Sequence, residues 1–231
     1  MKTIGLIGGM SWESTVPYYQ IINEEINRRC GGLHSAKILM YSVDFAEIEA
    51  NMTKGDWATN AAILTDIAVR LEKAGADFIL ICTNTLHKVA PEVQSHISVP
   101  IIHIADAVSE ALLARGITKA GLLGTKYTMQ QDFYKERMIA RGIEVITPDE
   151  HDMERVNDII FGELCLGQFK DESRKEYAAI IEKLAAKGAQ GIVFGCTEIG
   201  LLLKPEDSCL QVFDTTVIHA KKAAALALET M

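Results

Sequence analysis

The chain contains one segment twice, and this repeat constrains the fold more than any other feature of the sequence. Residues 71–85 read LEKAGADFILICTNT, and residues 184–198 read LAAKGAQGIVFGCTE. Gly75 and Gly188, at the two predicted helix ends, are 188 − 75 = 113 residues apart. The same shift places Thr83 on Cys196. Each copy has the pattern of a helix end, a glycine cap, a buried strand and a small nucleophilic residue. The sequence therefore predicts two similar halves, each with a hydroxyl or thiol where a strand ends.

Two shorter matches extend the repeat. Residues 2–8 (KTIGLIG) resemble residues 118–124 (TKAGLLG), and residues 99–102 resemble residues 210–213. Apolar runs alternate with amphipathic helical stretches throughout, which is typical of parallel sheets covered by helices. The expected strands are Thr3–Ile7, Lys37–Ser42, Asp77–Ile81, Val99–His103, Ala120–Leu123, Glu144–Ile146, Gly191–Phe194 and Leu210–Phe213. The expected helices are 14–29, 57–74, 84–94, 106–115, 129–141, 153–166, 172–187, 197–202 and 215–229.

These patterns predict an α/β fold of two pseudo-symmetric domains, each a parallel sheet covered by helices. We expect the first domain to comprise residues 1–98 plus 211–231 and the second to comprise residues 99–210. Ligands of open α/β sheets bind beyond the carboxyl ends of the strands. The repeat therefore predicts an active site in the cleft between the domains, with opposed acid/base groups.

Composition narrows the class of function. The 231 residues carry a net charge of −8, which argues against a nucleic-acid partner and against an acidic membrane surface. The five cysteines are scattered, no pair has a CxxC spacing, and no histidine cluster completes a metal site. Free thiols and the lack of a long apolar run predict a soluble cytoplasmic protein without a metal.

The residues at the predicted strand ends admit functional and structural interpretations. A turn of Gly8, Gly9 and Met10 follows the first strand, where a ligand or a tight turn would both require glycine. Asn84 and Thr85 lie at a predicted helix start. Residues at such a position either bind an anion or act as N-caps of the helix. Cys196 begins the corresponding helix, so the helix dipole is expected to lower the pKa of its thiol.

At these residues the chain resembles the cofactor-independent aspartate/glutamate racemase family. That family carries Cys-Asn-Thr-x-His in its first half and Gly-Cys-Thr-Glu in its second. Here the motifs read Thr83-Asn84-Thr85-Leu86-His87 and Gly195-Cys196-Thr197-Glu198, and the turn at Gly8-Gly9-Met10 matches as well. The resemblance covers essentially the whole chain and implies an amino-acid racemase that moves a proton between the two faces of Cα without pyridoxal phosphate or metal.

The resemblance also implies roles for individual positions. Thr83 and Cys196 correspond to the two catalytic residues, while Asn84, Thr85 and Thr197 would hold the α-carboxylate and ammonium groups of a small amino-acid substrate. Cys82 precedes the catalytic position; its side chain points opposite to that of Thr83 if the strand continues, and an irregular turn would reverse that. The further substrate-binding positions are Met10, Met52, Thr125, Cys165 and Glu198.

Two departures from the family pattern affect the expected chemistry. Thr83 replaces the first catalytic cysteine, and a hydroxyl donates a proton to a carbanion more readily than it removes one. In the family the second-half cysteine faces the α-hydrogen of the L-enantiomer, so we expect a bias towards L-substrates with Cys196 as the base. The positions expected to supply basic groups for a side-chain carboxylate are occupied by residues 45–52, which contain no Arg, and by Cys165.

Other functions remain open at the level of sequence. The lone matched Cys196 also suits a single-cysteine decarboxylase of substituted malonates, in which the thiol protonates the carbanion. Maleate isomerase and hydantoin racemase share the fold, and loss of one thiol is compatible with a non-catalytic amino-acid-binding protein. Exchange of the α-proton with solvent separates a racemase from a binding protein. A homodimer is the default expectation for a soluble oligomer.

Overall fold

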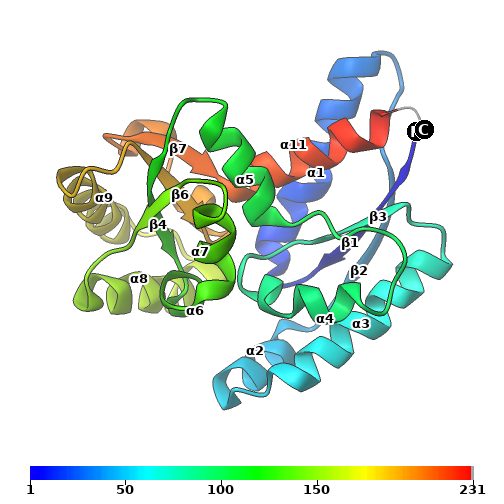
Figure 1. Ribbon diagram of the computed structural model, residues 1–231, viewed down its shortest axis with the longest axis horizontal. Helices are drawn as coiled ribbons and strands as arrows, with labels where there is room; N and C mark the ends of the chain where they lie inside the picture. The colour runs from blue at the N-terminus through cyan, green and yellow to red at the C-terminus, as the bar shows by residue number, and fades with distance from the viewer. Residues whose placement is uncertain (230–231) are drawn as a thin grey trace. The chain divides into compact units, whose positions relative to one another are not determined.

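A computed structural model describes residues 1–229 and divides the chain into two compact units (Figure 1). Unit 1 comprises Met1–Ile104 and the C-terminal segment that begins at His219. Unit 2 is the continuous segment Ala105–Ile218. Within residues 1–229, no helix combines the length and apolar character that a membrane span requires.

Unit 1 is built on a three-stranded parallel sheet of order β2-β1-β3. Helices from both ends of the chain pack on it, because α11 re-enters unit 1 at His219. In chain order the elements are β1 (Thr3–Gly8), α1 (Trp12–Cys30), β2 (Lys37–Ser42), α2 (Phe45–Lys54), α3 (Trp57–Lys73), β3 (Phe78–Ile81), η1 (Thr85–Val89), α4 (Ala90–Gln94) and α11 (Thr215–Leu228).

The core of unit 1 follows from the two-residue period of its strands. Ile4 and Leu6 of β1 and Phe78 and Leu80 of β3 lie on one face of the sheet, because alternate strand residues point the same way. This face packs against Tyr18, Ile22 and Ile26 of α1 and against four alanines of α11, which are Ala220, Ala223, Ala224 and Ala227. Helix α3 contacts all three strands of the sheet and contributes the buried side chains of Leu64, Ile67, Ala68 and Leu71.

Unit 2 is built on a four-stranded parallel sheet of order β5-β4-β6-β7. Its apolar core joins Leu123 of β4 and Ile192 and Phe194 of β6 to buried side chains of two long helices, α8 and α9. In chain order the elements are α5 (Ile104–Leu113), β4 (Lys119–Gly124), α6 (Lys126–Gln130), α7 (Asp132–Ile139), β5 (Glu144–Ile146), α8 (Glu150–Gly162), η2 (Leu164–Leu166), α9 (Asp171–Ala186), β6 (Gly191–Gly195), α10 (Ile199–Leu202), η3 (Pro205–Asp207) and β7 (Gln211–Asp214).

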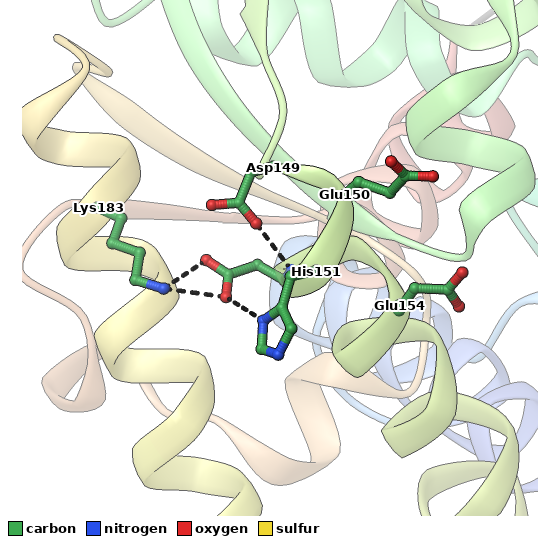
Figure 2. Close-up of a pocket in the computed structure, with 6 residues that line it drawn as sticks. Asp149, Glu150, His151, Glu154 and Lys183 are labelled. Atoms are coloured by element: carbon green, nitrogen blue, oxygen red, sulfur yellow. Dashed lines mark hydrogen bonds and ion pairs between the residues drawn. The ribbon is translucent and has the colours of Figure 1, made fainter.

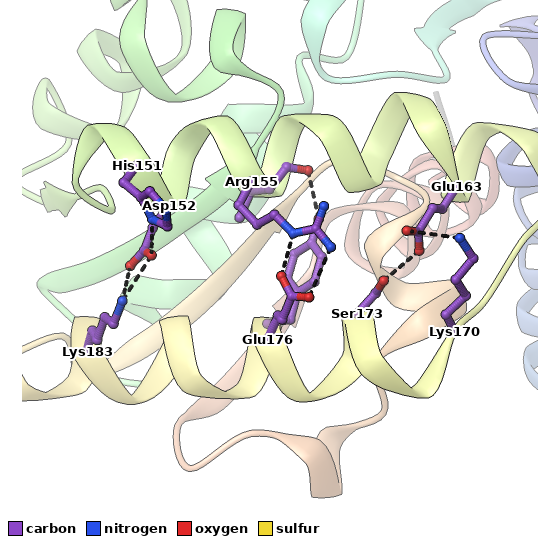
Figure 3. Close-up of polar contacts among 10 residues, drawn as sticks. His151, Asp152, Arg155, Glu163, Lys170, Ser173, Glu176 and Lys183 are labelled. Carbon is purple, nitrogen blue, oxygen red and sulfur yellow. Dashed lines mark hydrogen bonds and ion pairs between the residues drawn. The ribbon is translucent and has the colours of Figure 1, made fainter.

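Polar contacts join α8 to α9 along their outer sides (Figure 3). Lys183 donates to both carboxylate oxygens of Asp152 at 2.9 and 2.7 Å. Arg155 pairs with Glu176 in the middle of the two helices, and Ser173 donates to Glu163 near the other end. These contacts fix the register of the two helices, while the apolar core beneath them supplies most of the driving force.

Strand register shows that the first three strands of the two sheets correspond. Gly5 of β1 pairs with Ile79 of β3 in unit 1, and Gly121 of β4 pairs with Ile192 of β6 in unit 2. These are corresponding positions of the sequence repeat, and in both units the first strand lies between the second and the third. The structure thus confirms the predicted α/β class with two parallel sheets flanked by helices.

The structure differs from the expected elements in several places. The strand predicted over Val99–His103 is reduced to a single bridge between Ile101 and Ile79, since Pro100 has no N–H to donate to a ladder. The helix predicted over 84–94 is a 3₁₀ turn, η1, followed by the short helix α4, and Pro91 lies in the first turn of that second helix. Helix α2 was not predicted from the sequence; Asp44 caps it by accepting from the N–H of Ala46.

Candidate functional site

The turn after β1 is packed against the protein itself. The Gly9 N–H donates to Thr15 Oγ1 at 2.9 Å, and Gly9 adopts φ 88°, a conformation that favours glycine. A Cβ at Gly9 would meet the Val43 carbonyl oxygen at 2.5 Å. Of the two interpretations left open for this turn, the structure therefore supports the tight turn. Met10, expected to bind substrate, follows it and is buried.

The Thr83-Asn84-Thr85 segment follows β3, which is the neighbour of β1 in the sheet. All three residues are buried. The Thr83 carbonyl oxygen accepts a hydrogen bond of 2.7 Å from Nδ1 of His87, four residues further along the chain. The segment is thus held by its own motif histidine, and η1 begins only at Thr85.

Cys82 occupies the position just before Thr83, and its side chain lies in the apolar core of unit 1. It is fully buried, and burial raises the pKa of its thiol far above the ordinary value. Its N–H continues the β3 ladder by donating to the Ile7 carbonyl at 2.9 Å. The ladder of β3 continues to the N–H of Cys82, and its side chain points into the core, as expected for a structural cysteine.

In unit 2 the corresponding segment is Cys196-Thr197-Glu198, after β6. Cys196 Sγ donates to Glu198 Oε2 at 2.9 Å, and Thr197 Oγ1 donates to the same oxygen at 2.9 Å. Cys196 and Glu198 are only 7% and 2% exposed. A thiol and a hydroxyl therefore converge on one buried carboxylate, which is a strong acceptor in a site of low dielectric.

The expected lowering of the Cys196 pKa is wrong. Burial raises the pKa of this thiol well above its usual value, and the negative charge of Glu198 raises it further. The helix that was expected to stabilise a thiolate, α10, begins at Ile199 and contains only four residues. Its dipole is too short and too distant to offset burial, so Cys196 rests as a protonated thiol.

The remaining expected site residues lie in both units. Thr125 follows Gly124, the partner of Gly195 in the β4–β6 ladder, and it caps α6 by accepting from the Thr128 N–H at 3.3 Å. Cys165 lies in η2 and packs against the core cluster that contains Cys196. Met52 is buried in α2. Thr125 and Cys196 therefore both follow paired strand residues at the same edge of the sheet.

A separate surface pocket of about 730 Å³ lies at the start of α8 (Figure 2). Ligand atoms of Asp149, His151 and Asp152 lie within 4.8 Å of one another there. Both oxygens of Asp152 already accept from Lys183, and Asp149 caps the helix by accepting from the Asp152 N–H at 2.9 Å. We assign these groups to a helix cap and an ion pair, and none of the expected site residues lines the pocket.

Comparison with known proteins identifies the family. The sequence profile of the Asp/Glu/Hydantoin racemase family matches residues 7–223. The chain belongs to this family. It is 27% identical over 225 residues to the broad specificity amino-acid racemase RacX of Bacillus subtilis (strain 168), with 96% of each chain covered.

Solved structures agree with this assignment. A candidate Asp/Glu racemase from Yersinia pestis is 55% identical, with a TM-score of 0.92 over 99% of this chain and 100% of that one. An aspartate racemase homologue from Pyrococcus horikoshii OT3 is 39% identical, with a TM-score of 0.84 over the same shares. This member of the Asp/Glu/Hydantoin racemase family is therefore an enzyme, an isomerase of the racemase type.

The histidines had no predicted role, and Glu198 was predicted only to bind substrate. The spacing of His87 from Thr83 was the available signal, because a side chain at i+4 reaches the carbonyl of residue i across one turn. The contact of Cys196 with Glu198 had no such signal, since residues two apart seldom face each other in regular structure.

Proposed function

We propose that this racemase interconverts the enantiomers of aspartate, glutamate or both without a cofactor, with Cys196 and Thr83 acting at Cα. One observation carries the proposal. The two residues occupy corresponding positions after β6 and β3, in sheets whose strand pairings correspond. The family membership supports proton transfer at Cα as the reaction, and the pairing of the two motifs supports these residues as the groups that perform it.

The contact between Cys196 and Glu198 supplies a route to the thiolate. In the first step the Cys196 S–H proton moves to Glu198 Oε2, its hydrogen-bond acceptor at 2.9 Å. The thiolate then removes the α-proton of the L-amino acid, and the Thr83 hydroxyl donates a proton to the opposite face of the carbanion. Solvent afterwards takes one proton from Glu198 and returns one to Thr83, so the protons balance. Glu198 acts here as a proton acceptor for the thiol, in addition to the substrate contact expected from the resemblance.

The side-chain specificity of this reaction is proposed to be broad. Lys126 follows β4 and Thr125, but its ammonium pairs with Glu154, which raises the pKa of Lys126. The positions that were expected to carry basic groups are residues 45–52 and Cys165, and neither supplies a basic side chain. Neutral contacts at these positions discriminate weakly between acidic and uncharged side chains. The proposed bias towards L-substrates rests on the acidity difference between a thiol and a hydroxyl, together with the resemblance, which implies that Cys196 faces the α-hydrogen of the L-enantiomer.

One observation favours a second function on the same fold. Cys196 rests as a protonated thiol, and a single buried thiol is a suitable proton donor to a carbanion. In a malonate decarboxylase the loss of CO₂ would create that carbanion, and Cys196 would protonate it. The paired Thr83 segment favours the racemase, because a decarboxylase requires only one of the two groups.

Proton exchange at Cα in D₂O, followed by NMR, tests the proposal. Purified enzyme without pyridoxal phosphate is incubated with L-Asp, L-Glu, D-Asp and D-Glu in separate samples, with Cys196→Ala as the control. We expect exchange of the L-substrates with accumulation of the D-isomer, and no exchange in Cys196→Ala. Loss of CO₂ from a substituted malonate in the absence of any amino-acid exchange would instead establish the decarboxylase.

The assembly state is proposed to be a homodimer. Light scattering of the purified chain tests it directly, since a dimer has twice the chain mass of 25.4 kDa. A mass equal to that of one chain at micromolar concentration would contradict the proposal.

A further inference from the structure

Three histidines cluster in the interior of unit 1 and take no part in the proposed proton transfers. His87, His103 and His219 are all buried. The ring centroid of His87 lies 4.4 Å from that of His103 and 5.9 Å from that of His219. Tyr18 of α1 adds its hydroxyl, 2.9 Å from His219 Nδ1. Buried polar groups such as these imidazoles are normally hydrogen-bonded, so their partners show which parts of the backbone they hold.

The protonation pattern of His87 follows from its two neighbours. The Thr83 carbonyl oxygen at 2.7 Å can only accept, so Nδ1 of His87 must carry a proton. The Ile104 N–H at 3.2 Å can only donate, so Nε2 must be unprotonated. His87 is therefore a neutral Nδ1–H imidazole with both nitrogens used, and the other tautomer would break both contacts.

The tautomer of His219 likewise follows from its two neighbours, with the roles of Nδ1 and Nε2 exchanged. Nε2 donates to the Ile102 carbonyl at 2.7 Å, and Nδ1 accepts from the Tyr18 hydroxyl. Burial lowers the pKa of His219 to about 4, which agrees with a neutral ring. Two neutral imidazoles thus hold the two sides of the short segment Ile102–Ile104.

This segment is where the chain passes out of unit 1, and His219 is where it returns. The contacts run from Tyr18 through His219 to the Ile102 carbonyl, and from the Ile104 N–H through His87 to the Thr83 carbonyl. The side chain of His87 consequently ties the backbone at Thr83 to the segment at which the chain leaves unit 1.

We propose that His87 is a positioning residue for the Thr83 hydroxyl, acting through its Nδ1–H bond to the Thr83 carbonyl. This inference rests on the proposed function, in which Thr83 donates a proton to one face of Cα. A catalytic side chain must be held to within about 0.5 Å of its productive position. The Thr83 hydroxyl is carried by the backbone that His87 holds, so loss of the bond displaces the proton donor and leaves the Cys196 thiol in unit 2 unchanged.

Two substitutions separate the contacts of His87. In His87→Asn the amide nitrogen takes the place of Nδ1 and donates to Thr83, but the side chain is too short to reach Ile104. In His87→Gln the amide oxygen takes the place of Nε2 and accepts from the Ile104 N–H, but the bond to Thr83 is lost. Ile22→Val, in the same core, serves as a control for mild destabilisation.

The measurement is the ratio of D-isomer formation to solvent exchange of the L-substrate. In the proposed mechanism, exchange of the L-substrate requires Cys196 and Glu198 but not Thr83, whereas formation of the D-isomer also requires Thr83. We expect His87→Gln to lower this ratio roughly 10- to 100-fold. His87→Asn and Ile22→Val should stay within about twofold of the wild type, because both retain the contact with Thr83. A ratio that is unchanged in His87→Gln, or lowered equally in the Gln and Asn variants, would overturn the proposal.

Two readouts are independent of activity. The ¹⁵N NMR spectrum of the wild type should show His87 as the Nδ1–H tautomer at pH 7, and an Nε2–H tautomer would contradict the proposed contacts. Hydrogen exchange at the Ile104 amide should become faster in His87→Asn and stay slow in His87→Gln. If the wild type exchanges no amino acid, the proposed function fails. The tautomer and the Ile104 amide then still decide whether His87 holds this backbone.

Discussion

The thiol of Cys196 and the carboxylate of Glu198 share one hydrogen bond in a site almost closed to water. At the scale of single residues, burial and the neighbouring Glu198 together raise the pKa of the Cys196 thiol. The proton of Cys196 therefore stays on sulfur at rest. The position of Cys196 at a strand end was predicted correctly from the sequence. Its protonation could not be predicted, because it depends on burial by residues that are distant in the sequence.

Replacing Glu198 by Gln tests the proton route. The amide still accepts a hydrogen bond from the thiol but takes up no proton, so exchange of the α-proton of L-Asp should fall by about 10²- to 10⁴-fold. Glu176→Gln is the matched control, because Glu176 is a carboxylate of the same unit that pairs with Arg155 on the outer side of α8 and α9. Exchange that survives Glu198→Gln at the wild-type rate would remove Glu198 from the mechanism.

Thr83→Cys restores the thiol that the family pattern has at this position. A thiol is far more acidic than a hydroxyl, so it removes a proton from the D-enantiomer more readily. We expect the rate of D-Asp exchange to rise towards that of L-Asp, with Thr83→Ser retaining the bias of the wild type. NMR of α-proton exchange in D₂O, in reactions started from each pure enantiomer, measures both rates. Equal wild-type rates from the two enantiomers would already contradict the L-bias.

At the scale of elements, local sequence predicted the buried strands better than the short helices. Continuous apolar runs such as Gly191–Gly195 identify a strand without any knowledge of its neighbours. Elements of four or five residues, such as α10 and α4, are determined by their tertiary surroundings. The contact of Tyr18 with His219 joins residues 201 positions apart, so no local pattern announces it.

Close approach of β4 and β6 supplies a prediction at this scale. A Cβ at Gly124 would meet the Gly195 carbonyl oxygen at 2.7 Å, where the two strands are paired. Gly124→Ala should therefore lower the free energy of unfolding by about 1–3 kcal/mol. Gly162→Ala at the end of α8 is the control, since a Cβ there meets nothing within 4 Å and its φ is not positive. Urea denaturation followed by circular dichroism compares the two variants.

At the scale of the whole molecule, the buried neutral His219 makes stability depend on pH. Its pKa of about 4 in the folded protein lies below the ordinary value of about 6.5 for an unfolded chain. The unfolded state therefore binds the proton more strongly between these values, and stability falls as the pH is lowered from about 6.5 to 4. The stabilisation that depends on this group is fully present above pH 6.5.

Urea unfolding at pH 7, 5.5 and 4.5 measures this dependence. His219 alone accounts for a loss of up to about 3 kcal/mol by pH 4, at 1.36 kcal/mol per pKa unit. His219→Asn lacks the titrating ring, so its stability, although lower at pH 7, should decline less steeply towards acid. Parallel declines of the wild type and His219→Asn would exclude a contribution from this histidine.

Unit 1 is interrupted in sequence by the whole of unit 2, and its two ends meet where Lys2 N–H donates to the Ala227 carbonyl at 2.9 Å. This connectivity sets an order for biosynthesis. Unit 2 leaves the ribosome as one uninterrupted segment and contains every strand of its own sheet. The core of unit 1 is completed only by the last helix, so the sheet face that α1 and α11 share in the folded protein lacks the alanines of α11 until that helix emerges.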